Sequence, residues 1–285
     1  MRLSIEHIIR QFSQQLAVNS ETAKLDVELL LARSLGKDRT YLFTWSDKSV
    51  TEKEELTFKE LFARRLKGEP IAYILGRQAF WDLELKTAEH TLIPRADTET
   101  LIEWAIELAV ALPKQAKVID LGTGTGAIAL SLAYECKHWD VQGVDLIPQA
   151  VELAQHNAML NQLEHVRFFQ SSWFDRVEGQ FDLIVSNPPY IDPDDAHLTQ
   201  GDVRFEPKSA LVADNNGLAD LEWIAEQSRE YLLKGGWLLM EHGFDQQEAV
   251  QHLLIKLGYQ QVATRLDLAG NPRITGGQFY NGAVL

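Results

Sequence analysis

The feature that most constrains the fold is an alternation of helix-like and strand-like segments that begins near Asp97 and continues toward the end of the chain. Short apolar runs, typical of buried strands, alternate with stretches of helical period. The pattern predicts helices at 97–112, 126–134, 148–160, 218–232 and 246–257, and strands at 117–121, 141–144, 166–170, 181–186 and 236–240. It therefore predicts an α/β fold in which helices cover both faces of a doubly wound, mostly parallel sheet.

The N-terminal part of the chain shows helical patterns only. Apolar residues recur at helical spacing over 5–16, and a second helix around 25–35 stops at Gly36. A third helix begins with a capping box formed by Thr51 and Glu54. Because 285 residues exceed the usual size of one domain, we expect a main domain with a helical appendage. The predicted boundaries are 1–76 for the helical domain, 77–93 for a connecting β-hairpin and 94–285 for the sheet domain.

A glycine-rich turn follows the predicted strand at 117–121. The run Gly122-Thr123-Gly124-Thr125-Gly126 leads from this strand into a helical pattern. Glycine permits positive φ and lets a ligand approach the backbone, and free N–H groups at the helix start can face a polar ligand. The turn has no Lys or Arg to pair with a pyrophosphate, and it matches the dinucleotide spacing only in a relaxed form. It therefore favours a cofactor with a cationic sulfonium and no phosphate.

An acidic residue, Asp145, ends the second predicted strand of the sheet domain. A carboxylate about 20 residues beyond such a loop can accept two hydrogen bonds from a ribose diol. The alternative is that Asp145 caps the helix predicted at 148–160. Both roles remain open at this point.

A second corner follows the apolar run 181–185, where Asn187-Pro188-Pro189-Tyr190 leaves a strand. An Asn side-chain oxygen and a backbone carbonyl that point the same way can grip a planar NH2 group. The two prolines stiffen the corner because each ring fixes φ near −65°, and Pro188 also restrains Asn187. The alternative is an ordinary turn, since Asn and Pro are common turn residues. The glycine turn upstream favours a methyl-transfer site.

These motifs together resemble the class I S-adenosylmethionine-dependent methyltransferases with an Asn-Pro-Pro-Tyr motif, and among them the peptide chain release factor N5-glutamine methyltransferases. The resemblance covers nearly the whole chain. It is carried by residues 68–76, 92–99, 122–126, 187–190 and 201–207. It implies a seven-stranded methyltransferase sheet, closed by a hairpin from 260–263 and 278–284, and methylation of the Gly-Gly-Gln glutamine of release factors.

The resemblance also implies roles for individual residues. Cofactor binding is expected at Gly122, Thr123, Gly124, Thr125, Gly126, Asp145, Trp173 and Asn187. Substrate binding is expected at Asn187, Pro188, Pro189 and Tyr190, of which Asn187, Pro188 and Tyr190 are catalytic. Trp173 would lie near the adenine, although a purely structural aromatic is the alternative. Ser172 stands where the family often has an aspartate, which leaves the usual contact to the adenine amino group open.

Three other functions compete with this one. An N6-adenine nucleic-acid methyltransferase could hold a flipped adenine at the same corner. A glutamine methyltransferase of a large-subunit ribosomal protein would share the same chemistry, and a cofactor sensor would bind without turnover. The net charge of −14 and the acidic residues Asp192, Asp194 and Asp195 count against binding to a phosphate backbone. We therefore expect a protein substrate and no direct nucleic-acid binding.

Composition and further motifs bear on the cellular compartment, on metal binding and on the roles of four more residues. The single cysteine, Cys136, excludes an internal disulfide and suits a reducing compartment, and neither a signal peptide nor a spanning segment is predicted. We expect a cytoplasmic monomer. The histidines lack metal-ligand spacing, so no metal is expected. Glu241 and His242 are expected to form structural hydrogen bonds, and Arg204 and Glu206 to order the loop beside the substrate.

Overall fold

The computed structural model describes residues 3–280 and divides the chain into two compact units. The helical unit runs to Gly76 and includes Thr199–Phe205, and the sheet unit comprises Arg77–Leu198 and the chain from Glu206 onward. The β-hairpin therefore belongs to the sheet unit, whereas the sequence pattern suggested a separate linker. In the part of the chain that the structure describes, no helix is long and apolar enough to cross a membrane.

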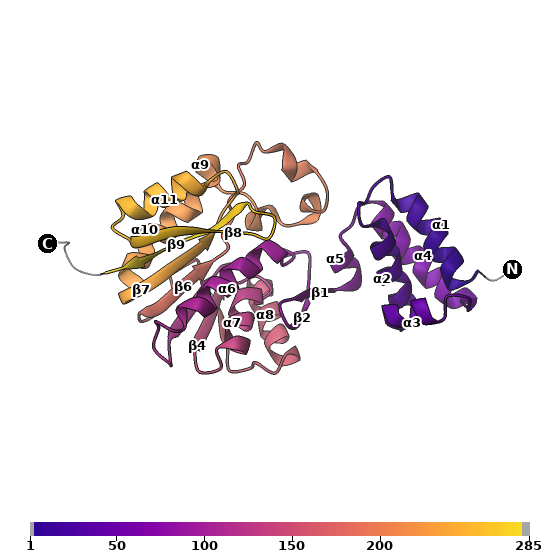
Figure 1. Ribbon diagram of the computed structural model, residues 1–285, viewed down its shortest axis with the longest axis horizontal. Helices are drawn as coiled ribbons and strands as arrows, with labels where there is room; N and C mark the ends of the chain where they lie inside the picture. The colour runs from indigo at the N-terminus through magenta and orange to yellow at the C-terminus, as the bar shows by residue number, and fades with distance from the viewer. Residues whose placement is uncertain (1–2, 281–285) are drawn as a thin grey trace. The chain divides into compact units, whose positions relative to one another are not determined.

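Five α-helices lie in the described part of the helical unit before Gly76 (Figure 1). They are α1 (Ile5–Leu16), α2 (Ala23–Leu35), α3 (Arg39–Thr44), α4 (Glu52–Leu66) and α5 (Ile71–Leu75). The core includes an edge-to-face cluster in which the Phe12 ring lies 4.9 Å from Phe58 and 4.8 Å from Phe62. The predicted capping box of Thr51 and Glu54 is confirmed. The short helices α3 and α5 were not predicted, because five or six residues show no clear helical period.

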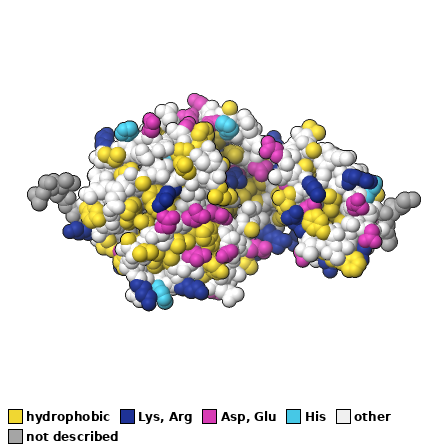
Figure 2. All heavy atoms as spheres, in the orientation of Figure 1, with side chains coloured by type: hydrophobic (Ala, Val, Ile, Leu, Met, Phe, Trp, Pro, Cys, Tyr) yellow, Lys and Arg dark blue, Asp and Glu magenta, His cyan; other side chains and the backbone are white. Residues whose placement is uncertain are grey.

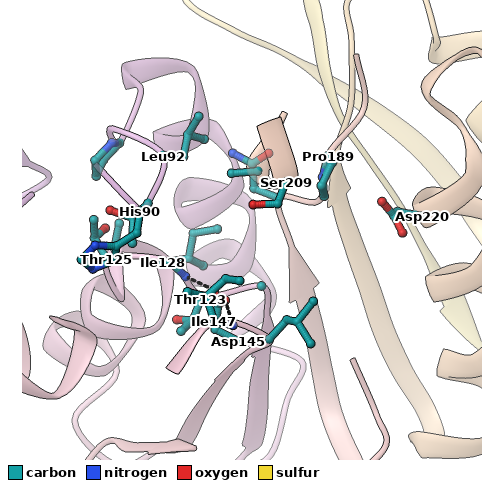
Figure 3. A pocket seen from close by; sticks show the side chains of 18 of the residues that line it. His90, Leu92, Thr123, Thr125, Ile128, Asp145, Ile147, Pro189, Ser209 and Asp220 are labelled. Atoms are coloured by element: carbon teal, nitrogen blue, oxygen red, sulfur yellow. Dashed lines mark hydrogen bonds between the residues drawn. The ribbon is translucent and has the colours of Figure 1, made fainter. Parts of the chain in front are cut away.

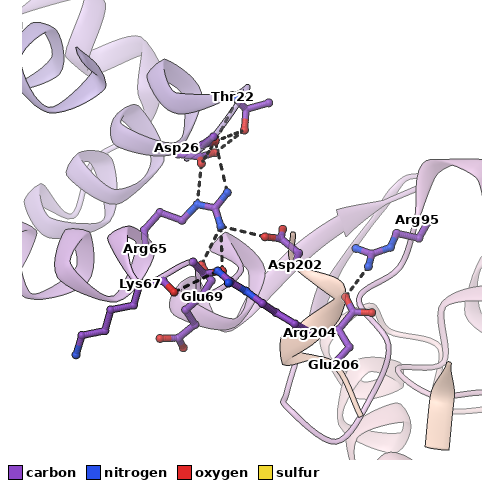
Figure 4. Close-up of polar contacts among 11 residues, drawn as sticks. Thr22, Asp26, Arg65, Lys67, Glu69, Arg95, Asp202, Arg204 and Glu206 are labelled. Carbon is purple, nitrogen blue, oxygen red and sulfur yellow. Dashed lines mark hydrogen bonds and ion pairs between the residues drawn. The ribbon is translucent and has the colours of Figure 1, made fainter. Parts of the chain in front are cut away.

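A buried arginine holds the returning segment Thr199–Phe205 within the helical unit (Figure 4). Arg65 donates to Asp26 Oδ2 at 2.8 Å and to Asp202 Oδ1 at 3.0 Å. Arg204 donates to the Lys67 carbonyl and crosses directly over Gly68, whose φ of +94° and missing Cβ admit the guanidinium. These contacts explain why a segment from the middle of the chain belongs to the N-terminal unit.

The sheet unit contains the predicted seven strands in the order β5-β4-β3-β6-β7-β9-β8. Their bounds are β3 (Lys117–Leu121), β4 (Asp140–Asp145), β5 (Arg167–Gln170), β6 (Phe181–Ser186), β7 (Leu232–Glu241), β8 (Gln260–Leu266) and β9 (Pro272–Phe279). Strands β3 to β7 are parallel, and β9 pairs antiparallel with both β7 and β8. This confirms the predicted fold. The last strand begins at Pro272 and not at 278, and positions 281–284 of the prediction lie outside the described residues.

Helices cover both faces of this sheet (Figure 1). One apolar core packs α6 (Glu99–Leu108), α7 (Ala127–Glu135) and α8 (Pro148–Leu160) against the sheet. The other packs α10 (Ala219–Tyr231) and α11 (Gln247–Lys256) against the opposite face. Neighbouring residues of β6 divide between these cores, because Leu183 faces the first and Ile184 the second. The shorter helices are η1 (Ala96–Thr98), η2 (Ala196–Thr199), η3 (Val203–Phe205), η4 (Lys208–Ala210) and α9 (Asp214–Gly217).

The strand order brings both predicted corners to one edge of the sheet. Strand β3 lies between β4 and β6, and Leu121 at its end pairs with Val144 on one side and Ser186 on the other. The residues that follow each strand therefore meet where parallel strands end, which is the usual ligand site of a doubly wound sheet.

The β-hairpin supports this edge. Its strands are β1 (Arg77–Phe80) and β2 (Leu83–Lys86), and the buried side chain of Asn157 on α8 links it to the glycine turn. Asn157 Oδ1 accepts from the Lys86 N–H at 2.7 Å, and its Nδ2 donates to the Thr125 carbonyl at 2.8 Å. One side chain thus fixes both the hairpin and the loop.

Candidate active site

A pocket of about 240 Å³ opens at this edge of the sheet (Figure 3). Its wall combines the glycine turn, Asp145, the segment 171–173 and part of the Asn-Pro-Pro-Tyr corner. Among the described residues that line it there are two carboxylates, Asp145 and Asp220, and no Lys or Arg. The pocket therefore suits a cation better than a phosphate, in agreement with the argument from the sequence.

The glycine turn is held by backbone hydrogen bonds. The N–H groups of Gly122 and Thr123 both donate to the Val144 carbonyl, at 2.9 and 2.8 Å. Gly122 has a φ of +73°, and a Cβ there would lie 3.3 Å from the Trp173 ring. Any larger residue would be strained at this φ and would crowd the aromatic ring across the pocket. The turn thus provides the close, side-chain-free approach that a nucleoside-type ligand requires.

Asp145 lies at the end of β4, in the pocket wall. Its two carboxylate oxygens accept from the Gly124 N–H at 2.8 Å and from the Ile147 N–H at 2.9 Å. Burial raises its pKa, and these backbone hydrogen bonds oppose that rise. The N-cap residue of α8 is Ile147, so Asp145 lies two residues before the N-cap position and is not the helix cap. Each oxygen keeps a lone pair for a ligand hydroxyl.

The aromatic Trp173 also lines the pocket, next to Ser172. Its backbone adopts a φ of +47°, and its carbonyl accepts from the Ser171 hydroxyl at 2.9 Å. A bulky residue with positive φ is costly, and such strain concentrates at functional sites. The structure therefore places Trp173 beside the glycine turn, in the pocket wall.

Asp120 is a buried carboxyl beneath the turn for which the sequence analysis predicted no role. Its Oδ2 accepts from the Thr123 hydroxyl at 2.6 Å and from the Ala129 N–H at 3.3 Å. Its Oδ1 is buried with no hydrogen-bond partner among residues 3–280. Burial raises the pKa of Asp120 to about 7. Its place two residues before the first glycine of the turn was the available signal.

The Asn-Pro-Pro-Tyr corner contributes to the same pocket through Asn187 and Pro189. Pro188 is buried, and neither it nor Tyr190 is among the described residues of the pocket wall. The Tyr190 hydroxyl donates to Glu241 Oε1 at 3.3 Å, and its carbonyl accepts from Gln246 Nε2 at 3.0 Å. The corner is thus anchored to the end of β7 and to the residue before α11.

Glu241 and His242 make the structural hydrogen bonds expected of them. Glu241 Oε2 accepts from the Thr98 hydroxyl at 2.6 Å, and His242 Nε2 lies 2.7 Å from the Thr275 hydroxyl. Burial raises the pKa of Glu241 to about 7 and lowers that of His242. Both are fully enclosed, at 1% and 0% exposure.

Several lining residues come from segments with no predicted site role. His90, Thr91 and Leu92, which follow the hairpin, form part of the wall, as do Ser209 and Asp220 from beyond the corner. The segments 68–76 and 92–99 were noted for their resemblance, yet nothing in the sequence indicated that only the second reaches the pocket. Arg95 pairs with Glu206 at 2.6 Å (Figure 4), and the role of Glu206 in ordering the loop beside the substrate stays a prediction.

Comparison with known proteins identifies the family. Residues 7–76 match the model of the PrmC N-terminal domain, and residues 103–206 match that of the methyltransferase small domain. The release factor glutamine methyltransferase of Aliivibrio fischeri is 50% identical over 282 residues, which cover 98% of this chain and 99% of that protein. The Escherichia coli protein of the same name is 45% identical over 280 residues, 98% of this chain and 100% of that protein. The chain belongs to the release factor glutamine methyltransferase family.

Membership in this family confirms the resemblance seen in the sequence and the expected methyl donor, S-adenosylmethionine. Among solved structures, a methyltransferase from Pyrococcus furiosus shares the fold, with a TM-score of 0.52 and 22% identity. The match covers 76% of this chain and 96% of that one.

Proposed function

We propose that this member of the release factor glutamine methyltransferase family transfers a methyl group from S-adenosylmethionine to the side-chain amide nitrogen (N5) of a glutamine in peptide chain release factors. The glutamine would be that of their Gly-Gly-Gln motif. The observation that carries the proposal is a single pocket bounded by the glycine turn, Asp145 and Asn187. A methyl donor held by the glycine turn and an amide held at Asn187 would therefore lie in the same pocket.

The residues of the pocket fit the cofactor. Backbone groups of residues 122–126 would hold it, the free lone pairs of Asp145 would accept its ribose hydroxyls, and Trp173 would pack on its adenine. Asn187 would border the reacting end. When bound, S-adenosylmethionine supplies an electrophilic methyl group on a positively charged sulfur, and a wall with carboxylates and no Lys or Arg suits that charge.

The corner would position the nucleophile. An amide nitrogen reacts poorly because its lone pair is delocalised into the carbonyl, so rigid placement must supply much of the catalysis, up to roughly 7–11 kcal/mol. The Asn187 side-chain oxygen and the Pro188 carbonyl would accept the two N–H groups of the glutamine. Pro189 would border the entrance and Tyr190 would cover the flat face of the amide. As the N–C bond forms, the S–C bond breaks and the nitrogen releases its proton to solvent.

The helical unit would recognise the folded release factor. It has its own apolar core, and it exposes Phe43 and Trp45 at 57% and 45% around α3. Lys48 Nζ lies 4.3 Å from the centre of the Trp45 ring, so the aromatic face is paired with a cation. Figure 2 shows apolar side chains at the surface of this unit, close to Lys and Arg. Exposed aromatics next to basic groups are typical of protein-binding surfaces.

The decisive experiment follows methyl transfer from labelled cofactor to four acceptors in parallel. These are intact release factor, a glutamine peptide of its motif, large-subunit ribosomal protein and duplex DNA. We expect rapid labelling of the release factor and poor labelling of the peptide, because the corner recognises only an amide. Labelling of DNA that rises at low salt, with none on the release factor, would overturn the proposal in favour of adenine methylation.

The same assay tests the helical unit. Phe43→Ala and Trp45→Ala should each raise the KM for release factor by about fivefold or more, since buried aromatics dominate such contacts. Their peptide methylation should be unchanged. Val18→Ala removes another exposed apolar side chain, 87% exposed, and serves as the matched control. Equal effects on peptide and release factor would contradict a docking role.

A further inference from the structure

A line of hydrogen bonds connects the proposed catalytic amide to a buried carboxylate. Asn187 Nδ2 donates to Thr98 Oγ1 at 3.2 Å, and the Thr98 hydroxyl donates to Glu241 Oε2 at 2.6 Å. Thr98 is 4% exposed and Glu241 is 1% exposed, so the hydrogen bond between these two residues is shielded from water. The three residues come from η1, the end of β6 and the end of β7.

The direction of these bonds follows from the number of protons available. A hydroxyl has one proton, and a short bond to a carboxylate takes it. Toward Asn187, the Thr98 hydroxyl therefore has only lone pairs and can only accept. The NH2 group of the Asn187 amide can donate to it, whereas the amide oxygen cannot. A reversed amide would set Asn187 Oδ1 against the Thr98 oxygen and lose the hydrogen bond.

The carboxylate is itself held by its surroundings. Its other oxygen, Oε1, accepts from the Tyr190 hydroxyl. Burial raises the pKa of Glu241 to about 7, and the hydrogen bonds from Thr98 and Tyr190 together with the charge of Arg273 on β9 favour its charged form against that rise. Asp97, beside Thr98 on η1, opposes that charge. Glu241 thus accepts hydrogen bonds from two directions, one of which leads to Asn187 and the other to the end of the same corner.

We propose that Thr98 and Glu241 are positioning residues that fix the amide of Asn187, so that its oxygen and not its NH2 group faces the glutamine. The inference rests on the proposed function, since only an amide or amine acceptor needs an oxygen there. A glutamine N–H then meets an acceptor. With the Asn187 amide reversed, two NH2 groups would face one another and the nucleophile would be displaced.

A double-mutant cycle tests this proposal with intact release factor at saturating cofactor. Thr98→Val removes the hydroxyl at nearly constant volume and should lower kcat about tenfold or more, the value of one oriented hydrogen bond. Thr98→Ser should restore most of the rate. Cofactor affinity, measured by calorimetry, should stay within about threefold of wild type because the bond acts on the acceptor side.

The coupling to Asn187 separates positioning from general damage. In an Asn187→Ala background, Thr98→Val should cause no further loss, since the group it orients is gone. Thr57→Val on α4, where the hydroxyl donates to the Lys53 carbonyl at 3.1 Å, is the matched control. If Thr98→Val does not fold, the Glu241→Gln variant is used in its place. It should lower kcat by a smaller factor, and this loss should also vanish in the Asn187→Ala background.

The outcomes distinguish this inference from the function on which it rests. A wild-type enzyme that transfers no methyl to release factor would overturn both. Wild-type transfer with an unchanged kcat in Thr98→Val, or additive losses in the double variant, would overturn the positioning role alone. A tenfold loss of cofactor affinity in Thr98→Val would also do so, because it would make Thr98 a cofactor contact.

Discussion

The two halves of the pocket are built in different ways. The cofactor half is formed by backbone groups and one carboxylate from two neighbouring strands, with Gly124 bonded to Asp145 only 21 positions away. The substrate half depends on side chains from distant segments, because Thr98 and Glu241 are separated by 143 positions. The backbone groups that would hold the cofactor are formed by nearby segments of sequence. The orientation of the Asn187 amide depends on side chains that the folded sheet brings together from distant segments. The two halves should therefore fail differently when they are mutated.

The largest expected effect belongs to the substrate half. Asn187→Ala should lower turnover on release factor at least about a hundredfold, because a displaced nucleophile loses the benefit of orientation. Cofactor affinity should change by less than about threefold, since the backbone groups that would hold the cofactor are untouched. Single-turnover methyl transfer and calorimetry measure the two quantities separately. Near-normal turnover would remove Asn187 from the mechanism and with it the contrast between the halves.

The cofactor half should show the opposite pattern. Asp145→Ala should weaken binding of S-adenosylmethionine about tenfold or more, because a hydrogen bond to a charged group is worth about 1.5–3 kcal/mol. At saturating cofactor, kcat should recover toward wild type. Asp140→Ala removes an exposed carboxylate at the other end of β4 and is the control. Unchanged affinity in a folded Asp145→Ala protein would reduce Asp145 to a support of the turn.

The smallest expected effect concerns Asp120, a carboxyl that lies fully buried beneath the cofactor half of the pocket. Its folded pKa of about 7 lies above the ordinary value of 3.8, so its contribution to stability is complete below that ordinary value and is lost as the pH rises toward 7. Asp120→Asn does not titrate. Relative to wild type, its free energy of unfolding should rise between pH 5 and pH 8 by roughly 1 kcal/mol or more.

Denaturant unfolding of both proteins at the two pH values measures this difference. Asp140→Asn, at an exposed position on the neighbouring strand, provides the control. A difference between Asp120→Asn and wild type that is the same at pH 5 and pH 8 would contradict the raised pKa.

The contrast between the halves also explains what could be predicted from the sequence. The glycine turn, Asp145 and the Asn-Pro-Pro-Tyr corner are contiguous motifs at strand ends, and the structure brings them to one edge because β3 lies between β4 and β6. Glu241 was expected to make a structural hydrogen bond, but its link to Asn187 through Thr98 was not. No local pattern marks a contact across 89 positions, because tertiary packing alone determines which side chain reaches it.

The division of the chain into two units has a practical consequence for exchanging parts between relatives. The helical unit includes Thr199–Phe205, which Arg65 holds through Asp202. A chimera joined only at Gly76 would pair the helices of one parent with a returning segment from the other. A chimera must therefore take both pieces from the same parent. The residues that have to come from one parent, because they contact one another, are 26, 65, 68, 202 and 204.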